Sequence, residues 1–198
     1  HEARQRIEAA LHTVGLRPDD VLGKHPHQVS GGQRQRIMIA RACLMEPKLI
    51  VADEPVSMVD ASLRSTILDI MLRMRDENGI SFLYITHDLS TAYQICDDIH
   101  IFYQGAQVES GAVDAVLGNA KHPYTQLLLA SIPEPDPERG WGTQLPPTDE
   151  ADNAGNAAFG CPFYPRCPRR MECCKTSPPP RVTLDTPGHH VACHQSGK

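Results

Sequence analysis

Apolar residues recur three and four positions apart in several stretches of the first 130 residues. This spacing places them on one face of a helix, so each stretch predicts an amphipathic helix. The predicted helices cover residues 2–15, 33–45, 61–76, 89–96, 112–117 and 123–130.

Two short apolar runs lie between these helices, at residues 49–52 and 81–85. Continuous apolar runs of this length are typical of strands that are buried on both faces of a parallel sheet. Residues 99–103 and 106–109 predict two further strands, joined by a turn at Gln104-Gly105. The order helix–strand–helix–strand–helix therefore predicts a layered α/β fold with a parallel sheet.

The composition changes near residue 133. Twelve of the 17 prolines lie between Pro133 and Pro187, and five of the seven cysteines lie between Cys161 and Cys193. Because proline fixes φ and lacks a backbone donor, we expect this irregular segment to extend neither a sheet nor a long helix. A metal, disulfides or docking onto the first part of the chain would then have to hold it.

Charge and hydropathy exclude some functions. The net charge of -5 gives no reason to expect free nucleic acid as the main ligand. No apolar run approaches the roughly 18 residues that a membrane-spanning helix needs. The chain begins with His1 rather than Met and runs at once into a helix-like segment, which suggests a fragment.

Ser30-Gly31-Gly32-Gln33 lies directly before a predicted helix. Backbone N–H groups at the positive end of a helix can bind an anion such as phosphate. Taken alone, a flexible loop with an ordinary helix N-cap explains these residues equally well.

Charged residues also follow both predicted parallel strands. Asp53 and Glu54 end the first, where α/β sheets bind ligands. Because adjacent strand residues point in opposite directions, one carboxylate can hold Mg²⁺ through water while the other faces an attacking water. The alternative is an acidic helix-capping loop. His87, after the second strand, could contact a γ-phosphate, although a structural histidine is the plainer interpretation.

The three motifs occur together in this order, and jointly they resemble the second half of the nucleotide-binding domain of ABC-type ATPases. Ser30 to Gln33 resembles the signature motif, and the run that ends at Asp53 resembles the Walker B strand. Glu54 stands where the family has its catalytic glutamate. Ser57 to Asp60 lies at the position of the D-loop, with Met58-Val59 in place of the commoner Ala-Leu, and His87 at that of the switch histidine.

The resemblance implies a P-loop NTPase-like core that uses ATP and Mg²⁺. Asp53 would fix Mg²⁺ through water, Glu54 would act as general base and His87 would stabilise the γ-phosphate. The signature residues would cap the ATP of a second ABC ATPase subunit, and Asp60 would link the two sites across the dimer. The signature residues meant here are Ser30, Gly31, Gly32 and Gln33.

Two later segments resemble ATP-binding subunits of oligopeptide and dipeptide importers. One is His122-Pro123-Tyr124-Thr125, and the other is the cysteine-rich run 161–168. Such subunits imply transmembrane permeases as partners, a substrate-binding protein indirectly, and a peripheral location at the cytoplasmic face of the membrane.

The same resemblance divides the chain at residue 132. Residues 1–132 would be the C-terminal portion of the nucleotide-binding domain, and residues 133–198 the importer-type extension. Within the first part we expect a helical signature subdomain (1–46), a core from Walker B to the switch histidine (47–111) and closing helices (112–132).

No G-x-x-x-x-G-K-[ST] phosphate-binding loop occurs in the 198 residues. We therefore expect a truncated copy that binds ATP poorly by itself and does not turn it over. A catalytically incompetent remnant and an ABC-type ATPase of non-transport function are the alternatives.

Cys161, Cys167, Cys174 and Cys193 supply four candidate metal ligands, and Cys173 is an alternative ligand. A reducing cytosol disfavours disulfides. Structural zinc usually shows tight C-x2–4-C pairs, which are missing here. A [4Fe–4S] cluster needs four thiolates at less constrained spacing, and the importer resemblance favours it. Cys43 and Cys96 are interpreted as buried apolar residues of helices.

Overall fold

The computed structural model describes residues 1–57, 59–132 and 160–196. These form two compact units, His1–Ile95 and Cys96–Lys198, which are described separately. Among the described residues, no helix is long and apolar enough to span a membrane.

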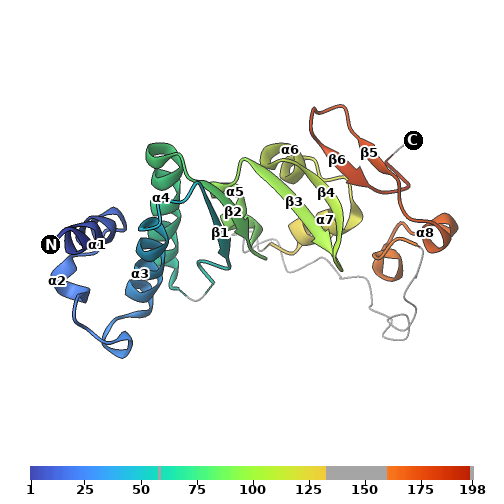
Figure 1. The fold of residues 1–198 in the computed structure, drawn as a ribbon. Helices are drawn as coiled ribbons and strands as arrows, with labels where there is room; N and C mark the ends of the chain where they lie inside the picture. Colours follow the sequence, from blue (N-terminus) through green and yellow to red (C-terminus); the bar gives the residue numbers. More distant parts are fainter. Residues whose placement is uncertain (58, 133–159, 197–198) are drawn as a thin grey trace. The chain divides into compact units, whose positions relative to one another are not determined.

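The first unit alternates helices with a small parallel sheet (Figure 1). Strands β1 and β2 pair in parallel, with Leu49 opposite Ser81 and Asp53 opposite Ile85. The elements are α1 (Glu2–Thr13), α2 (Pro18–Val21), the 3-10 turn η1 (Pro26–Gln28), α3 (Gly31–Cys43), β1 (Leu49–Asp53), α4 (Ala61–Asn78), β2 (Ser81–Ile85) and α5 (Leu89–Ile95).

Local sequence signals account for the helix boundaries of this unit. Helix α3 begins two residues earlier than predicted, because Ser30 and Gln33 form a reciprocal capping box around its first turn. Helix α4 ends at Gly79, whose φ of 66° fits the left-handed C-cap that glycine favours. The predicted apolar stripe of α4 is buried, and the unit's core gathers residues from several of its elements: Ala10, Leu11, Val14, Leu16, Val21, Ala40, Ile70, Met74 and Ile80.

The expectation that β1 and β2 are buried on both faces is wrong for this structure. Ile50 and Phe82 pack against the core, but the opposite face is open. On that face the exposed fractions are 56% for Leu49, 59% for Val51 and 53% for Leu83. The reason is that the sheet has two strands, and the described residues of this unit cover one of its faces.

The second unit is built on an antiparallel sheet of order β3-β4-β6-β5. The predicted hairpin is confirmed, since Gln104 and Gly105 both take positive φ values between β3 and β4. The elements are β3 (Asp98–Tyr103), β4 (Ala106–Ala112), α6 (Val113–Gly118), α7 (Pro123–Ala130), the 3-10 turn η3 (Tyr164–Arg166), α8 (Glu172–Thr176), β5 (Arg181–Thr183) and β6 (His190–Ala192).

The expectation that the proline- and cysteine-rich segment extends no sheet is also wrong. Strand β6 pairs with β4, placing Val191 opposite Glu109, and β5 pairs with β6. Proline disrupts a sheet only where a strand residue must donate a backbone hydrogen bond. The paired residues 181–183 and 190–192 contain no proline. Pro187 falls in the turn between the two strands, where it is tolerated.

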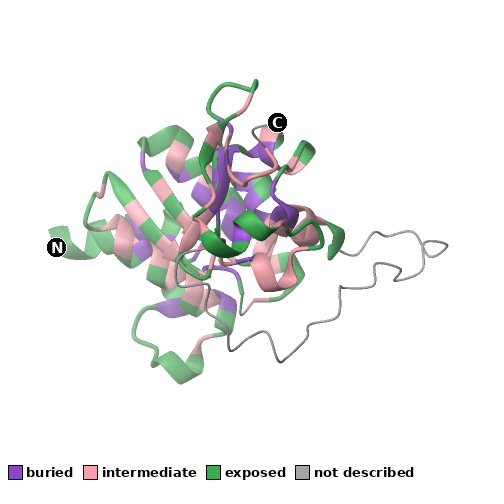
Figure 2. Cartoon of the chain, turned by 90° about the vertical axis from the view of Figure 1, so that its right-hand side faces the viewer, coloured by how far each residue is buried: buried purple, intermediate pink, exposed green. Residues whose placement is uncertain are grey.

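The helix and strand predictions for residues 1–130 hold to within a few residues. The short elements α2, η1, η3 and α8 were not predicted, because pieces of three to five residues carry too little periodicity. The compact units meet at Ile95, so they do not coincide with the predicted domains 1–132 and 133–198, which remain predictions. Figure 2 colours each described residue by its burial.

Candidate functional site

The predicted phosphate-binding residues lie at the exposed start of α3. The Ser30 hydroxyl accepts a hydrogen bond from Gln33 N at 3.1 Å, and the Gln33 side chain accepts one from Ser30 N at 2.9 Å. An added Cβ on Gly31 would meet no described atom within 4 Å, so a ligand can approach the backbone there. Gly32 is buried and packs against Leu63.

The predicted catalytic pair is in direct contact. Glu54 follows β1 and His87 follows β2, so both lie at the carboxyl ends of adjacent parallel strands. Oε1 of Glu54 lies 2.7 Å from Nδ1 of His87 and also accepts a hydrogen bond from His87 N at 3.2 Å. The His87 side chain is 81% exposed, so its other ring nitrogen is accessible to a ligand.

The loop that carries Glu54 is held in an unusual conformation. Glu54 has a φ of 46°, which is uncommon for a residue with a side chain. Its N–H donates to Ile85 O at 2.9 Å, and Gln35 of α3 donates to Pro55 O at 2.6 Å. These contacts connect the signature helix to the loop after β1.

Asp88 organises the residues next to His87. Its carboxylate accepts hydrogen bonds from Ser90 N and Thr91 N, which caps α5, and its other oxygen pairs with Arg64 at 3.1 Å. These bonds anchor the backbone on the carboxyl side of His87.

The remaining predicted nucleotide residues are on the surface. Asp53 ends β1 and is exposed, and Asp60 occupies the N-cap position of α4. Among the described residues, the Asp60 carboxylate makes no capping hydrogen bond. Met58 of the predicted D-loop lies outside the described residues.

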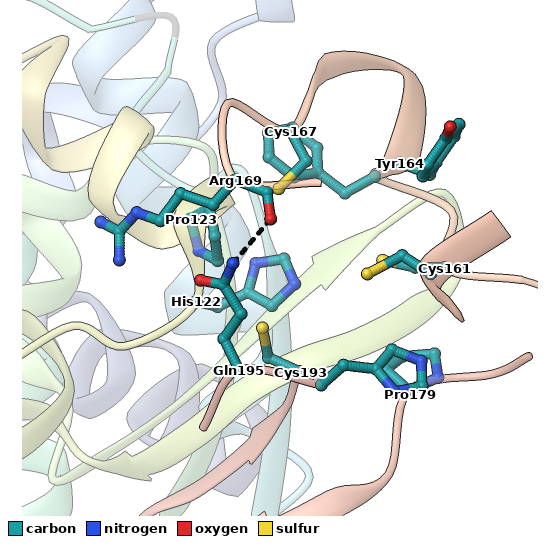
Figure 3. A pocket seen from close by; sticks show the side chains of 12 residues that line it. His122, Pro123, Cys161, Tyr164, Cys167, Arg169, Pro179, Cys193 and Gln195 are labelled. Atoms are coloured by element: carbon teal, nitrogen blue, oxygen red, sulfur yellow. Dashed lines mark hydrogen bonds between the residues drawn. The ribbon is translucent and has the colours of Figure 1, made fainter. Parts of the chain in front are cut away.

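The second unit brings the four predicted cysteine ligands to the lining of one small cavity. They come from three places: the turn around η3, helix α8 and the end of β6. Figure 3 shows the sulfurs of Cys161, Cys167 and Cys193 pointing toward a shared space, and Cys174 also lines it. Cys161 N donates to Cys174 O at 2.8 Å, which ties the η3 segment to α8.

The surroundings of these thiols favour their protonated form. Burial raises the pKa of Cys161, and the neighbouring Cys174, Cys167 and Cys193 raise it further. Burial likewise raises the pKa of Cys167 and of Cys174. Without a bound cation these thiols are therefore neutral, and a metal that binds here would have to displace their protons.

Cys173 lies on the exposed side of α8 and belongs to a different group. The Sγ atoms of Cys173 and Cys174 and a ring nitrogen of His194 all lie within 4.8 Å of one another. Nε2 of His194 lies 3.2 Å from Ser177 O. Among the described residues, no other three potential metal ligands lie this close together. The four cysteines that line the cavity are farther apart than this as a set.

Phe163 lines the cavity, and other rings pack around it. The rings of Tyr103 and Tyr124 lie 5.1 and 5.4 Å from Phe163, and His122 lies 5.8 Å from it. His122 also lines the cavity and accepts a hydrogen bond from Tyr124 N at its Nδ1. Burial lowers the pKa of His122 to about 4, against the opposing effect of the Glu109 charge.

Two residues beside the cavity were missed from the sequence. Glu109 and His189 form a fully buried pair, with His189 Nε2 at 2.8 Å from Glu109 Oε1. The available sequence signal was Glu109, the one acidic residue of the strand Ala106–Ala112. Cys43 and Cys96 were expected to be buried in helices, but both are half-buried, and Cys96 directly follows α5.

Both ends of the chain match known family models. Residues 1–57 match the ABC transporter model, and residues 108–174 match the oligopeptide/dipeptide transporter C-terminal region. The second match includes Cys161, Cys167 and Cys174.

Curated relatives align over almost the whole chain. The dipeptide transport ATP-binding protein DppF of Haemophilus influenzae is 38% identical over 97% of this chain and 58% of its own length. The oligopeptide transport ATP-binding protein OppF of Escherichia coli is 40% identical over 97% of this chain and 57% of its own length. The chain spans 54% to 60% of the length of such relatives.

Solved structures with the same arrangement are ATP-binding cassettes. MJ1267, an ATP-binding cassette of an ABC transporter in its ADP conformation, matches with a TM-score of 0.56 and 26% identity, over 64% of this chain and 50% of that one. CbiO1 of Clostridium perfringens matches with a TM-score of 0.54 and 30% identity, over 60% and 46%. The predicted ABC ATPase α/β fold is thereby confirmed, and almost the whole chain is similar to part of ABC transporter ATP-binding proteins of the oligopeptide/dipeptide type.

Proposed function

We propose that this chain serves in the ATP-binding subunit of an importer of oligopeptides or dipeptides, where ATP hydrolysis is coupled to transport. The observation that carries the proposal is the 2.7 Å contact between Glu54 and His87 at the carboxyl ends of two adjacent parallel strands. The matches to peptide importer relatives supply the class of cargo.

The residues at this edge fit ATP and Mg²⁺. Asp53 and Glu54 offer the carboxylate oxygens that Mg²⁺ prefers, and Asp53 is exposed, as a water-mediated contact requires. Bound Mg²⁺ would neutralise the charge of the transferred phosphate. Glu54 would accept the proton of the attacking water, and its contact with His87 fixes the carboxylate in place for that step.

The contact also constrains the proton on His87. When Glu54 is ionised, Nδ1 of His87 carries the proton of their hydrogen bond. The exposed Nε2 can then donate to a phosphate oxygen only if the ring is doubly protonated.

The other predicted residues act toward partners in this proposal. Ser30 to Gln33 would present the open start of α3 to the ATP of a second ABC ATPase subunit. Asp60, with its carboxylate unused by the helix cap, would contact that subunit. Transmembrane permeases would bind the assembly at the cytoplasmic face of the membrane, and a substrate-binding protein would deliver the peptide.

An ATPase assay tests the catalytic assignment. The 198-residue sequence has no Walker A motif, so the test protein is a chimera in which the N-terminal part of the Escherichia coli relative precedes residue 1. Glu54→Gln should lower the hydrolysis rate by about 10²- to 10⁴-fold while ATP binding persists. His87→Gln, which keeps a donor near the position of Nε2, should retain more activity than His87→Ala.

Two controls accompany the chimera. The chain alone should show no Glu54-dependent ATPase, and a normal rate from it would contradict the requirement for a phosphate-binding loop. If the chimera binds ATP but does not hydrolyse it, the remnant interpretation wins. Normal hydrolysis by the Glu54→Gln chimera would show that another residue is the base.

For the second unit, we propose that Cys161, Cys167, Cys174 and Cys193 hold a [4Fe–4S] cluster with a structural role. The supporting observation is their spacing. A single tetrahedral zinc ion with Zn–S distances of about 2.3 Å draws its sulfurs to about 3.8 Å from one another. The four cavity cysteines do not form a group with all sulfurs within 4.8 Å, as a larger polynuclear centre allows.

A zinc ion is the second candidate, and a specific observation favours it. Cys173, Cys174 and His194 form the tighter group, and the contact of His194 with Ser177 O is typical of a metal-bound histidine. Reconstitution with iron and sulfide separates the two. The cluster predicts absorption at about 400 nm that Cys161→Ser abolishes and Cys173→Ser leaves unchanged. The zinc site would be established by colourless protein that binds zinc, if Cys173→Ser abolishes zinc binding and Cys161→Ser does not.

A further inference from the structure

Glu109 of β4 is an acidic residue at the centre of the second unit. Its side chain has an exposed fraction of 0%. A buried carboxylate is costly unless it is fully hydrogen-bonded. Within the described chain, Oε1 accepts from Lys121 N and Oε2 accepts from His122 N, at 2.8 and 3.0 Å. Nε2 of His189 lies 2.8 Å from Oε1, within hydrogen-bonding distance.

These bonds reach two segments that border the cysteine cavity. The first is the N-terminus of α7, where His122 is the N-cap and its ring lines the cavity. The second is β6, which begins directly after His189 and ends directly before Cys193. Neither segment is adjacent to Glu109 in the sequence, so the carboxylate joins parts of the chain that are 12 to 80 residues apart.

The backbone around Glu109 leaves little freedom for this arrangement. An added Cβ on Gly111 would lie 3.0 Å from His189 Cα and 3.1 Å from Gly188 O. Strands β4 and β6 therefore meet closely next to the buried pair. A displacement of His189 would move β6, and with it Cys193.

We propose that Glu109 is a positioning residue for the metal centre of Cys161, Cys167, Cys174 and Cys193. Glu109 holds the start of α7 at His122, and strand β6 with the following Cys193, at the separation that the centre requires. The inference rests on the proposed metal centre, and it adds a residue that donates no ligand atom. Loss of the Glu109 charge leaves two backbone N–H groups and an imidazole without a common acceptor, so both segments relax away from the cavity.

Reconstitution of the full chain with iron and sulfide tests the proposal, since absorption at about 400 nm reports the cluster held by the cavity. A Cys173→Ser background removes the alternative three-ligand group. In that background, Glu109→Gln should speed the loss of iron to a chelator by about 10- to 100-fold, the usual size of effect for a residue that orients metal ligands. His189→Gln, which keeps a donor near the position of Nε2, should retain the cluster, and His189→Leu should lose it.

Val116→Ala is the control for general destabilisation, because Val116 is fully buried in the same unit on α6 and does not line the cavity. It should lower the melting temperature without speeding the loss of iron. The proposal is overturned if folded Glu109→Gln holds the cluster as the parent does, if His189→Gln loses iron as fast as His189→Leu, or if Val116→Ala matches Glu109→Gln at equal melting temperature.

Thiol alkylation keeps the two hypotheses apart. If the parent binds no metal, the proposed centre fails, but the positioning role still predicts faster alkylation of Cys161 and Cys174 in Glu109→Gln than in Val116→Ala. Both thiols are buried in the parent, so the parent gives a slow baseline. Equal alkylation rates in the two variants would overturn the positioning role as well.

Discussion

His122 shows how one buried side chain can control the acid stability of a unit. Burial lowers its pKa from 6.5 to about 4, so the unfolded chain takes up a proton at a higher pH than the folded chain does. Stability is therefore complete above about pH 6.5 and is lost as the pH falls toward about 4. Between about pH 7 and about pH 5 the loss from this group should be about 2 kcal/mol.

His122→Asn provides the measurement. Asparagine keeps an acceptor for Tyr124 N at the N-cap but does not titrate, so the variant should lose this part of the acid sensitivity. Denaturant unfolding of metal-free protein at the two pH values gives the difference between parent and variant. An identical pH dependence in both proteins would show that His122 does not account for it.

At this scale, sequence reasoning succeeded where residues stand at strand or helix ends. Glu54 and His87 could be predicted as neighbours, because the ends of adjacent parallel strands meet. The four candidate cysteine ligands line one cavity, and their role as metal ligands stays a prediction. Glu109 and His189 could not be paired, because their contact depends on a strand register between segments 80 residues apart.

Among the elements, β6 determines how the proline-rich segment folds. The prediction from proline content failed because it treated the segment as uniform, while the residues that pair in the sheet lie between the prolines. Helix, hairpin and parallel-strand predictions held because each rests on local periodicity or turn chemistry. The pairing of β4 with β6 is non-local, and no short pattern encodes it.

Gly111 tests the β4–β6 pairing. Its φ of 154° and the 3.0 Å approach of an added Cβ to His189 Cα predict that Gly111→Ala forces the strands apart. The expected loss of stability is about 1–3 kcal/mol, as in other overpacked sites. Gly118→Ala is the matched control, because its added Cβ meets no described atom within 4 Å. Equal melting temperatures for the two variants would contradict the close approach.

For the whole molecule, the two compact units divide the chemistry between them. The candidate nucleotide residues lie in His1–Ile95, and the cysteine cavity lies in Cys96–Lys198. Apo and metal-loaded protein should therefore differ in the unfolding of the second unit and little in that of the first. Hydrogen exchange at β4 and β6 compared with β1 and β2 measures this difference, and equal protection of all four strands by metal would contradict it.

The open face of β1 and β2 has a consequence for the behaviour of the chain in solution. Leu49, Val51, Leu83 and Ile85 share this face, because the parallel register places Val51 opposite Leu83. A contiguous apolar surface on a short sheet with unpaired edges promotes association between copies. In sedimentation experiments the chain should self-associate as its concentration rises, and Val51→Lys with Leu83→Lys should suppress this. A polypeptide that covers this face of β1 and β2 would therefore also prevent the chain from associating with further copies of itself.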